Sequence, residues 1–317
     1  MGMSTDPPTP VPSFRPSVAL LGADAGGSHS TVVIGLADGR LLGRAEGPGA
    51  SMKPGNATAS AAVLAETARR AAAQAALALP VDRAVVGAAG AGRAQEQAEL
   101  ESALRDVGLA RRVRVLADAE VALSAAFGRG PGVLVNAGTG SIAYARDPHG
   151  GLHRAGGYGW QLGDEGGGYW LGRRALEAAA WAQDGRGEGS TLLARLLAAL
   201  GLQHFDDLVR WTATATPAQV AALAPHVLNA AREGEAVAQR ALDDAARELV
   251  ALVAALEQHF PGSTPVPVAI AGGLLLVQSP LTAAFRQRLA VYVKRARLVP
   301  NRIDPAVGAL KLATELE

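Results

Sequence analysis

The sequence predicts an α/β protein made of two related halves, each with a mixed β-sheet covered by helices. The first observation behind this prediction is that the same order of sequence patterns occurs twice along the chain. The second is that each half begins with strand-like segments joined by glycine-rich turns and continues with helical segments that separate further strands. The third is size, because 317 residues with 49% hydrophobic side chains can form two sizeable cores.

Three strand-like segments open each half. In the first half, VALLGADAGGSHSTVVIGLADGRLLGRAEG contains three strands separated by turns at residues 26–27 and 38–39. In the second half, GVLVNAGTGSIAYARDPHGGLHRAGG has the same order, with turns at 138–140 and 150–151. Glycine in such turns is typical of tight hairpins. The two segments therefore predict two equivalent antiparallel units.

The remaining elements of each half also match in order. The first half continues with a predicted helix at 59–79, a buried strand at 84–88 and a glycine-rich exit at 90–92. The second continues with several helices between 167 and 259, a strand at 266–271 and an exit at 272–273. A basic strand then leads to a helix, through Asp118 in one half and Asp304 in the other. Each half thus reads β-β-β-α-β-α-β-α.

The predicted domain boundaries follow from this repeat. We expect a disordered, proline-rich lead at 1–16, an N-terminal lobe at 17–124 and a C-terminal lobe with a helical insertion at 125–303. The terminal helix at 304–317 is expected to pack near the N-terminal lobe. A cleft between two such lobes is a common place for a ligand.

Composition excludes several classes of function. The formal charge is +1, and the densest basic cluster (Arg111, Arg112 and Arg114) reads as a solvated strand edge, so no nucleic-acid partner is expected. The chain contains no cysteine, which excludes disulfides, thiolate metal sites and cysteine nucleophiles. No window resembles a membrane span, so we expect a cytoplasmic protein without a membrane partner.

Two glycine-rich turns could bind phosphate. The first, at 24–30, includes Gly26 and Gly27, and the second, at 136–141, includes Gly138 and Gly140. Glycine lets backbone N–H groups approach an anion closely, and two such turns could hold a triphosphate from both sides. Asp24 could then hold Mg²⁺ through its water shell. The alternative is that both are ordinary hairpin turns. A P-loop is absent, because none of the three lysines follows a glycine.

The turns DAGGSHS and NAGTGS, together with the run GGYGWQLGDEGGGYWLGR, resemble the BadF/BadG/BcrA/BcrD ATPase family and its N-acetylglucosamine kinase branch. The resemblance extends from Val18 to the terminal helix. It implies the duplicated ribonuclease H-like fold of actin and hexokinase, with five-stranded mixed sheets, and it implies ATP and Mg²⁺ as cofactors. The nucleotide and phosphate residues are then expected to be Asp24, Gly26, Gly27, Ser28, Ser30, Gly138, Thr139, Gly140, Gly272 and Gly273.

The acceptor site is expected near Asp118 and the GDEG run. Asp118 follows a strand and precedes a helix, so by position it is either a helix N-cap or a catalytic base. The resemblance favours the base. Aromatic side chains flank two carboxylates in the GDEG run, as a sugar ring requires, although they could equally pack at a helix start. The expected sugar-binding residues are Ser51, Ser141, Gly157, Tyr158, Asp164 and Glu165.

The resemblance and these residues together imply ATP-dependent phosphorylation of an amino sugar at its 6-hydroxyl. N-acetylglucosamine is the first candidate and glucosamine the next. Three positions depart from the family pattern, namely the Ala25–Ser28 turn, Tyr158 in place of tryptophan and Ser51 in place of asparagine. The last two leave the sugar open. The alternatives are a kinase of another sugar and a nucleotide-binding ATPase switch. A homodimer would fit the family, but the sequence does not indicate the oligomeric state.

Overall fold

The computed structural model describes residues 18–27, 29–187, 190–276, 278–300 and 303–316. The chain divides into two compact units. The first unit comprises the chain as far as Val121 together with the segment from Ala306 onward, and the second comprises Ala122–Pro305. The predicted lead at 1–16 and the predicted phosphate ligand Ser28 lie outside the described residues.

The first unit contains a five-stranded mixed sheet with strand order β3-β2-β1-β4-β5. β1 pairs antiparallel with β2 and β2 with β3, whereas β4 is parallel to both β1 and β5. The strands are β1 (Ala19–Ala25), β2 (His29–Leu36), β3 (Leu41–Pro48), β4 (Val81–Ala88) and β5 (Ala110–Ala117). Its helices are α1 (Ala57–Gln74), α2 (Ala94–Asp106) and α11 (Pro305–Ala313), and the division between the units falls within α3 (Asp118–Phe127), after Val121.

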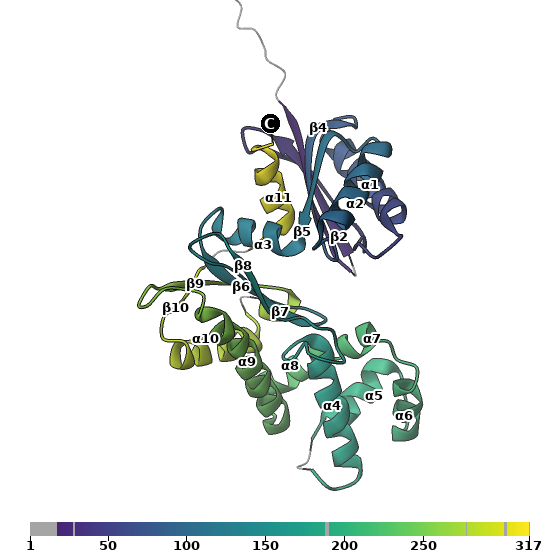
Figure 1. The fold of residues 1–317 in the computed structure, drawn as a ribbon. Coiled ribbons are helices and arrows are strands. Elements are labelled where there is room, and N and C mark those ends of the chain that lie inside the picture. The colour runs from purple at the N-terminus through teal and green to yellow at the C-terminus, as the bar shows by residue number, and fades with distance from the viewer. Residues whose placement is uncertain (1–17, 28, 188–189, 277, 301–302, 317) are drawn as a thin grey trace, which may run out of the picture. The chain divides into compact units, whose positions relative to one another are not determined.

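Alternation along β1 explains why helices cover both faces of this sheet. Leu21 and Ala23 belong to a core shared with α1 and α2, whereas Leu20 belongs to a separate core with α11 (Figure 1). Strands buried on both faces are nearly continuously apolar, as β1 and β2 are. At Gly22 a Cβ atom would lie 2.2 Å from the carbonyl oxygen of Ala306, so the missing side chain is what lets α11 pack so closely.

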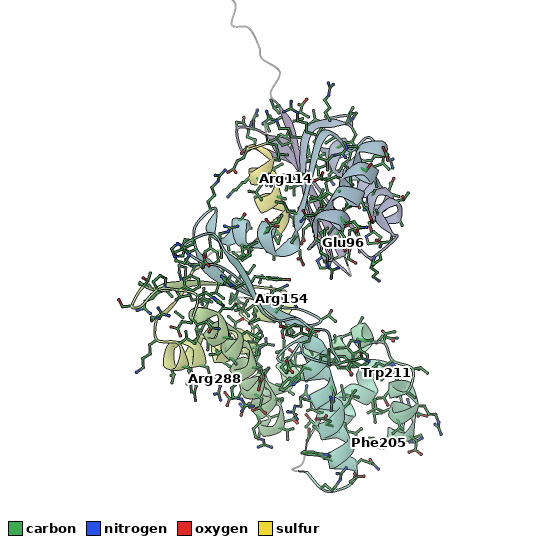
Figure 2. The ribbon with its side chains drawn as sticks, viewed as in Figure 1. Glu96, Arg114, Arg154, Phe205, Trp211 and Arg288 are labelled. Carbon is green, nitrogen blue, oxygen red and sulfur yellow. The ribbon has the colours of Figure 1, made fainter. Side chains whose placement is uncertain are left out.

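The basic cluster of β5 lies on the edge of this sheet. Arg111, Arg112 and Arg114 are exposed (Arg114 is labelled in Figure 2), and Arg111 lies 3.9 Å from Asp82. Glu101 of α2 accepts a hydrogen bond from the backbone N–H of Val115 at 2.9 Å. Charged side chains on an edge strand oppose pairing with another chain. The cluster therefore forms a solvated strand edge.

The second unit repeats the topology of the first. Its strands are β6 (Gly132–Ala137), β7 (Ser141–Arg146), β8 (Leu152–Gly156), β9 (Val266–Ala271) and β10 (Ala296–Leu298), in the order β10-β9-β6-β7-β8. β7 pairs antiparallel with both β6 and β8, whereas β9 is parallel to β6 and β10. When the strands of each half are numbered in chain order, both sheets have the order third, second, first, fourth, fifth. The predicted duplicated actin/hexokinase-type fold is confirmed.

Helices inserted between β8 and β9 enlarge this second unit (Figure 1). They are α4 (Gly168–Gln183), α5 (Leu192–Leu200), α6 (Phe205–Thr212), α7 (Pro217–Ala221), α8 (Ala224–Arg232) and α9 (Ala236–Glu257). The short 3₁₀-helix η1 (Gly273–Leu275) and α10 (Pro280–Tyr292) follow β9. Leu242, Leu249 and Val253 of α9 pack in one buried core with Val133 and Val135 of β6.

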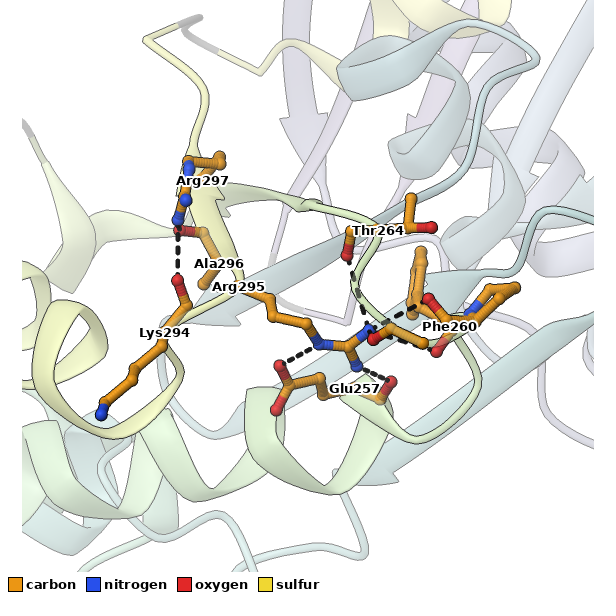
Figure 3. A network of polar contacts seen from close by, with 9 residues as sticks. Glu257, Phe260, Thr264, Lys294, Arg295, Ala296 and Arg297 are labelled. Atoms are coloured by element: carbon orange, nitrogen blue, oxygen red, sulfur yellow. Dashed lines mark hydrogen bonds and ion pairs between the residues drawn. The ribbon is translucent and has the colours of Figure 1, made fainter.

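The end of α9 is held by Arg295 (Figure 3). Its guanidinium donates to the Glu257 carboxylate at 2.8 Å and to the Glu257 carbonyl at 3.0 Å. It also donates to carbonyl oxygens of Phe260 at 3.4 Å, Pro261 at 3.2 Å, Thr264 at 3.5 Å and Gly262. The last carbonyls of a helix have no partner within the helix, so one arginine satisfies this end and fixes the connection into β9.

Some predicted boundaries were wrong. The helix predicted at 59–79 spans Ala57–Gln74, because Ala76 takes φ +52° and the N–H of Leu77 bonds back to Ala72. β4 and β5 each start before their predicted apolar cores, since strand pairing continues beyond the apolar run. Among the described residues, no helix is long and apolar enough to cross a membrane.

Candidate active site

The first glycine-rich turn connects β1 to β2 in the first unit. Asp24 is half-buried near the end of β1. The backbone N–H of Gly26 donates to the His29 carbonyl oxygen at 3.1 Å, and the Gly26 carbonyl oxygen accepts from the backbone N–H of Ala50 at 3.0 Å. A Cβ atom on Gly26 would lie 2.9 Å from the His29 carbonyl oxygen, whereas one on Gly27 would meet nothing within 4 Å. Gly26 thus closes the turn, and Gly27 leaves its outer side open to a ligand.

Ser30 lies inside the first unit. Its side chain is 0% exposed, and its hydroxyl has no hydrogen-bond partner among the described atoms. The hydroxyl is close to the site where Gly47 would carry a Cβ atom. Because successive side chains of a strand point to opposite faces of the sheet, the Ser30 side chain lies on the face of β2 that packs against α1. The Ser30 hydroxyl therefore points away from the opening of the turn, and any contribution to phosphate binding is left to its backbone.

The loop after β3 carries Ser51, which is half-buried. The Ser51 carbonyl accepts hydrogen bonds from the Asn56 amide and from the Ser60 hydroxyl, both at 3.1 Å. The backbone N–H of Met52 donates to Ala89 at 2.7 Å, which ties this loop to the exit of β4. The Asn56 side chain, which the sequence analysis did not single out, also accepts a hydrogen bond from the backbone N–H of Lys53 at 2.7 Å, so it holds this loop and does not cap α1.

Asp118 stands where β5 ends and α3 begins. In the register of the sheet, Ala25 of β1 pairs with Ala88, and Ala88 pairs with Ala117. Parallel strands end at one edge, so Asp118 shares that edge with Asp24. The Asp118 carboxylate accepts a hydrogen bond from its neighbour Ala119 at 2.9 Å. Burial nevertheless raises the pKa of Asp118 above the ordinary value of an aspartate.

The second glycine-rich turn, between β6 and β7, interlocks with residues 157–169, here called the acceptor loop. The N–H of Gly138 donates to Gly140 at 2.9 Å. From the loop, Gly168 donates to the Gly138 carbonyl and Tyr169 to the Thr139 carbonyl, both at 2.8 Å. In the other direction, the Ser141 hydroxyl donates to the Glu165 carbonyl at 2.6 Å. The structure thus brings together the turn and the GDEG run, which are separate motifs in the sequence.

Asp164 joins the acceptor loop to the turn. Its carboxylate accepts hydrogen bonds from the backbone N–H groups of Ser141 and Gly159. A Cβ atom on Gly140 would lie 2.3 Å from this carboxylate, so any larger residue there would displace the Asp164 side chain. Asp164 has φ +65°, a strained conformation for a residue with a side chain. Burial raises its pKa, the two backbone hydrogen bonds oppose this, and the charge of the exposed Glu165 raises it further.

Aromatic side chains of the acceptor loop are exposed. Tyr158 is 59% exposed and Trp160 is 45% exposed, and the ring of Trp160 lies 5.1 Å from that of Tyr169. The alternative that these aromatics simply pack in a core is therefore wrong for Tyr158 and Trp160, whereas Trp170 does pack against the core. A Cβ atom on Gly157 would lie 2.3 Å from Ile142, which explains the glycine before Tyr158.

The exit of β9 borders a cavity of about 220 Å³. Gly272 has φ +92°, and a Cβ atom there would lie 2.2 Å from the Ala137 carbonyl oxygen, whereas Gly273 is open. The Ser279 hydroxyl is buried without a hydrogen-bond partner among the described atoms. The cavity is lined by Pro225, Leu228, Asn229 and Arg232 of α8 and by Gly273, Leu276, Gln278 and Ser279. The α8 residues were missed in the sequence, although their i, i+3, i+4, i+7 spacing marks one helical face.

Comparison with known proteins gives the class to which this fold and these motifs belong. Residues 21–313 match the BadF/BadG/BcrA/BcrD ATPase family, and the chain belongs to that family. An N-acetylmuramic acid/N-acetylglucosamine kinase from Clostridium acetobutylicum is 33% identical over 231 residues, which is 72% of this chain and 76% of that protein.

Solved structures agree. A protein from Chromobacterium violaceum, provisionally assigned as an N-acetylglucosamine kinase, is 33% identical with a TM-score of 0.77, covering 94% of this chain and all of that one. A ROK family glucokinase from Streptomyces griseus shares the fold at 19% identity with a TM-score of 0.57, over 94% of this chain and 99% of that one. The chain is thus similar to sugar kinases over nearly its whole length.

Proposed function

We propose that this protein transfers the terminal phosphoryl group of ATP to the 6-hydroxyl of an amino sugar. The observation that carries the proposal is the interlocked second turn and acceptor loop. One compact piece of backbone there combines a glycine-rich turn, two carboxylates and exposed aromatic faces. N-acetylglucosamine is the first candidate acceptor and glucosamine the next. The 33% identity to a kinase named for N-acetylglucosamine and N-acetylmuramic acid supports this choice.

The acceptor loop supplies the chemistry that a sugar needs. The exposed ring of Tyr158 offers an apolar surface to the face of a pyranose. Asp164 and Glu165 can accept hydrogen bonds from sugar hydroxyls. We also assign Gly157 and Ser141 to sugar binding, because Gly157 belongs to the acceptor loop and Ser141 bonds to it. In the first unit we assign Ser51 to sugar binding, because its loop is tied to the exit of β4.

Three glycine pairs are proposed to hold the phosphates and the nucleoside. The N–H groups of Gly26 and Gly138 close their own turns, and we assign phosphate contacts to the other backbone N–H groups of the turns at Gly26–Gly27 and around Thr139. Gly272 and Gly273 lead into the cavity beside α8, which has room and mixed polarity for a nucleoside. Asp24 is the proposed Mg²⁺ residue, through water, because a half-buried carboxylate beside a phosphate-binding turn suits a hard cation.

Asp118 is the proposed catalytic base. When bound, ATP supplies the phosphoryl group, and Mg²⁺ neutralises the negative charge that develops on the phosphates during transfer. Asp118 would accept the proton of the sugar hydroxyl as the hydroxyl oxygen bonds to the γ-phosphorus, while the bond from that phosphorus to the bridging oxygen breaks and ADP leaves. Burial raises the pKa of Asp118, which makes its carboxylate a stronger proton acceptor than that of an exposed aspartate. Positioning by the end of β5 and the Ala119 N–H keeps the carboxylate fixed.

A coupled assay of ADP release tests the proposal directly. We expect release that depends on an amino sugar and on Mg²⁺, with N-acetylglucosamine, glucosamine and glucose compared at equal concentration. Phosphorus NMR of the product should show a phosphate ester at carbon 6. ADP release at the same rate with and without every sugar would contradict the proposal and favour the nucleotide switch.

A further inference from the structure

The loop between β3 and α1 (residues 49–56), here called the Ser51 loop, is fastened to two neighbouring segments of the first unit. The backbone N–H of Ala50 donates to the carbonyl oxygen of Gly26, in the first glycine-rich turn, at 3.0 Å. The backbone N–H of Met52 donates at 2.7 Å to a carbonyl oxygen just beyond the end of β4. The loop is therefore held between the proposed phosphate turn and the end of β4.

Ser51 lies between these two anchors. Its side chain is half-buried. Within the part of the chain that the structure describes, neither its hydroxyl nor its backbone N–H makes a hydrogen bond. The end of β4 pairs with the end of β5, so the loop reaches the sheet edge at which Asp118 stands. Ser51 therefore offers hydrogen-bond donors to a ligand at the edge that carries the proposed base.

Asn56 closes the Ser51 loop from its far end. Its side-chain amide donates to the Ser51 carbonyl oxygen at 3.1 Å, and its amide oxygen accepts from the backbone N–H of Lys53 at 2.7 Å. The Ser60 hydroxyl of α1 donates to the same Ser51 carbonyl at 3.1 Å. An asparagine side chain carries both a donor and an acceptor, so one residue can hold two points of the loop. These bonds fix the peptide plane that follows Ser51, and with it the direction of the Ser51 side chain.

The sequence KPGN places Asn56 for this contact. The backbone N–H of Asn56 donates to the Lys53 carbonyl oxygen at 3.1 Å, which closes a four-residue turn. Pro54 and Gly55 occupy its central positions, and Gly55 has φ +78°, as a type II turn requires. Asparagine is a favoured helix N-cap, yet this side chain makes no capping hydrogen bond to α1. The turn directs the amide back onto the Ser51 loop instead.

We propose that Asn56 is a positioning residue for the acceptor sugar, which holds Ser51 so that the Ser51 hydroxyl meets the sugar beside Asp118. This inference rests on the proposed kinase function and adds to its acceptor site a residue that does not itself touch the substrate. A hydrogen bond from Ser51 is made to the bound sugar and to the transition state alike, so its loss raises KM and leaves kcat nearly unchanged. Phosphate binding is assigned to the turn at Gly26–Gly27, so KM for ATP should not depend on Asn56.

The experiment measures KM and kcat for N-acetylglucosamine and KM for ATP in the full-length parent, Asn56→Ala, Ser51→Ala and the double variant. We expect Asn56→Ala to raise the sugar KM about five-fold, the contribution of one neutral hydrogen bond, and Ser51→Ala to raise it by a similar factor. The double variant should show much less than the product of the two effects, because Asn56 acts through Ser51. Thr58→Ala, at an exposed position in the first turn of α1, is the matched control and should change none of these constants.

Asn56→Asp provides the test if the alanine variant does not fold. It keeps the acceptor for Lys53 but loses the donor for Ser51, so the sugar KM should rise as in Asn56→Ala. Effects that multiply in full in the double variant would show that Asn56 acts independently of Ser51 and would overturn the inference. A parallel rise in KM for ATP would overturn it too, because Asn56 would then be a general structural residue. An unchanged sugar KM in a folded Asn56 variant would remove the inference and leave the proposed function intact, whereas a parent without sugar-dependent turnover would remove both.

Discussion

The two units present equivalent glycine-rich turns that are held in different ways. In the first unit, the turn after β1 is fixed by backbone hydrogen bonds from Ala50 and to His29, and carboxylates stand at the same edge of the sheet. In the second unit, the turn after β6 is fixed by the acceptor loop, with the carboxylate of Asp164 bonded to its backbone. The same topology thus carries two kinds of site.

This difference indicates a division of labour. Under the proposed function, Asp24 of the first unit serves metal handling and Asp118 serves proton transfer. The second unit has the exposed aromatics, the acceptor loop and the cavity beside α8, which suit recognition. Changes at Asp24 and Asp118 should therefore affect mainly the rate of chemistry, and changes in the acceptor loop or the cavity beside α8 should affect mainly binding. Substitutions in each unit can test that division.

The largest effect is expected for Asp118→Asn. Loss of the proposed base should lower kcat about a hundredfold or more, with KM for ATP nearly unchanged. Steady-state kinetics measure this, with the exposed Asp106→Asn at the end of α2 as the control. Because burial raises the pKa of Asp118 in the folded state, its charge costs stability at neutral pH, and that cost disappears as the pH falls below the unfolded-state pKa. The Asp118→Asn variant should therefore unfold at a temperature no lower than that of the parent. Equal kcat values in the variant and the parent would instead show that Asp118 only caps the helix.

Much of the fold was predictable from the sequence, and less of the site. Apolar strands and glycine turns have a local signal, so the duplicated order of elements was predicted correctly. The end of α1 was not, since the positive φ of Ala76 follows from packing and has no sequence signature. Asp164 and the second turn were both predicted as binding residues, but their mutual hydrogen bonds depend on tertiary contacts. The α8 lining of the cavity was missed because an ordinary amphipathic helix carries no sign of which neighbour it will meet.

A matched glycine pair tests the nucleotide side of the second unit. Gly272→Ala should lower the free energy of unfolding by more than about 2 kcal/mol, because the new Cβ atom would meet the Ala137 carbonyl at φ +92°. Gly273→Ala meets nothing within 4 Å and should leave stability nearly unchanged. Chemical denaturation measures both. Gly273→Ala should still weaken ATP binding in calorimetry, and unchanged ATP affinity would show that the nucleotide approaches elsewhere.

Asp164 tests whether recognition resides in the acceptor loop. Asp164→Asn tolerates the positive φ but weakens the hydrogen bonds from Ser141 and Gly159 by removing the charge. KM for the sugar should rise about ten-fold, while kcat changes less. Asp164→Gly relieves the strained backbone and removes the carboxylate, so it should unfold at a similar temperature yet bind sugar even more weakly. If both variants keep the parent KM, the loop does not bind the acceptor.

The smallest effect is expected for Asp24→Ala in the first unit. A carboxylate that holds Mg²⁺ through water contributes less than a direct ligand, since the cation keeps most of its hydration shell. We expect the Mg²⁺ concentration for half-maximal rate to rise about five-fold, with kcat largely restored at saturating Mg²⁺. Asp24→Asn keeps the size and an acceptor oxygen, so it should fall between the alanine variant and the parent. KM for the sugar should not change, because sugar recognition is assigned to the acceptor loop and to Ser51. Superimposable Mg²⁺ titrations would show that the first turn does not organise the metal, whereas an effect confined to sugar KM would contradict the division itself.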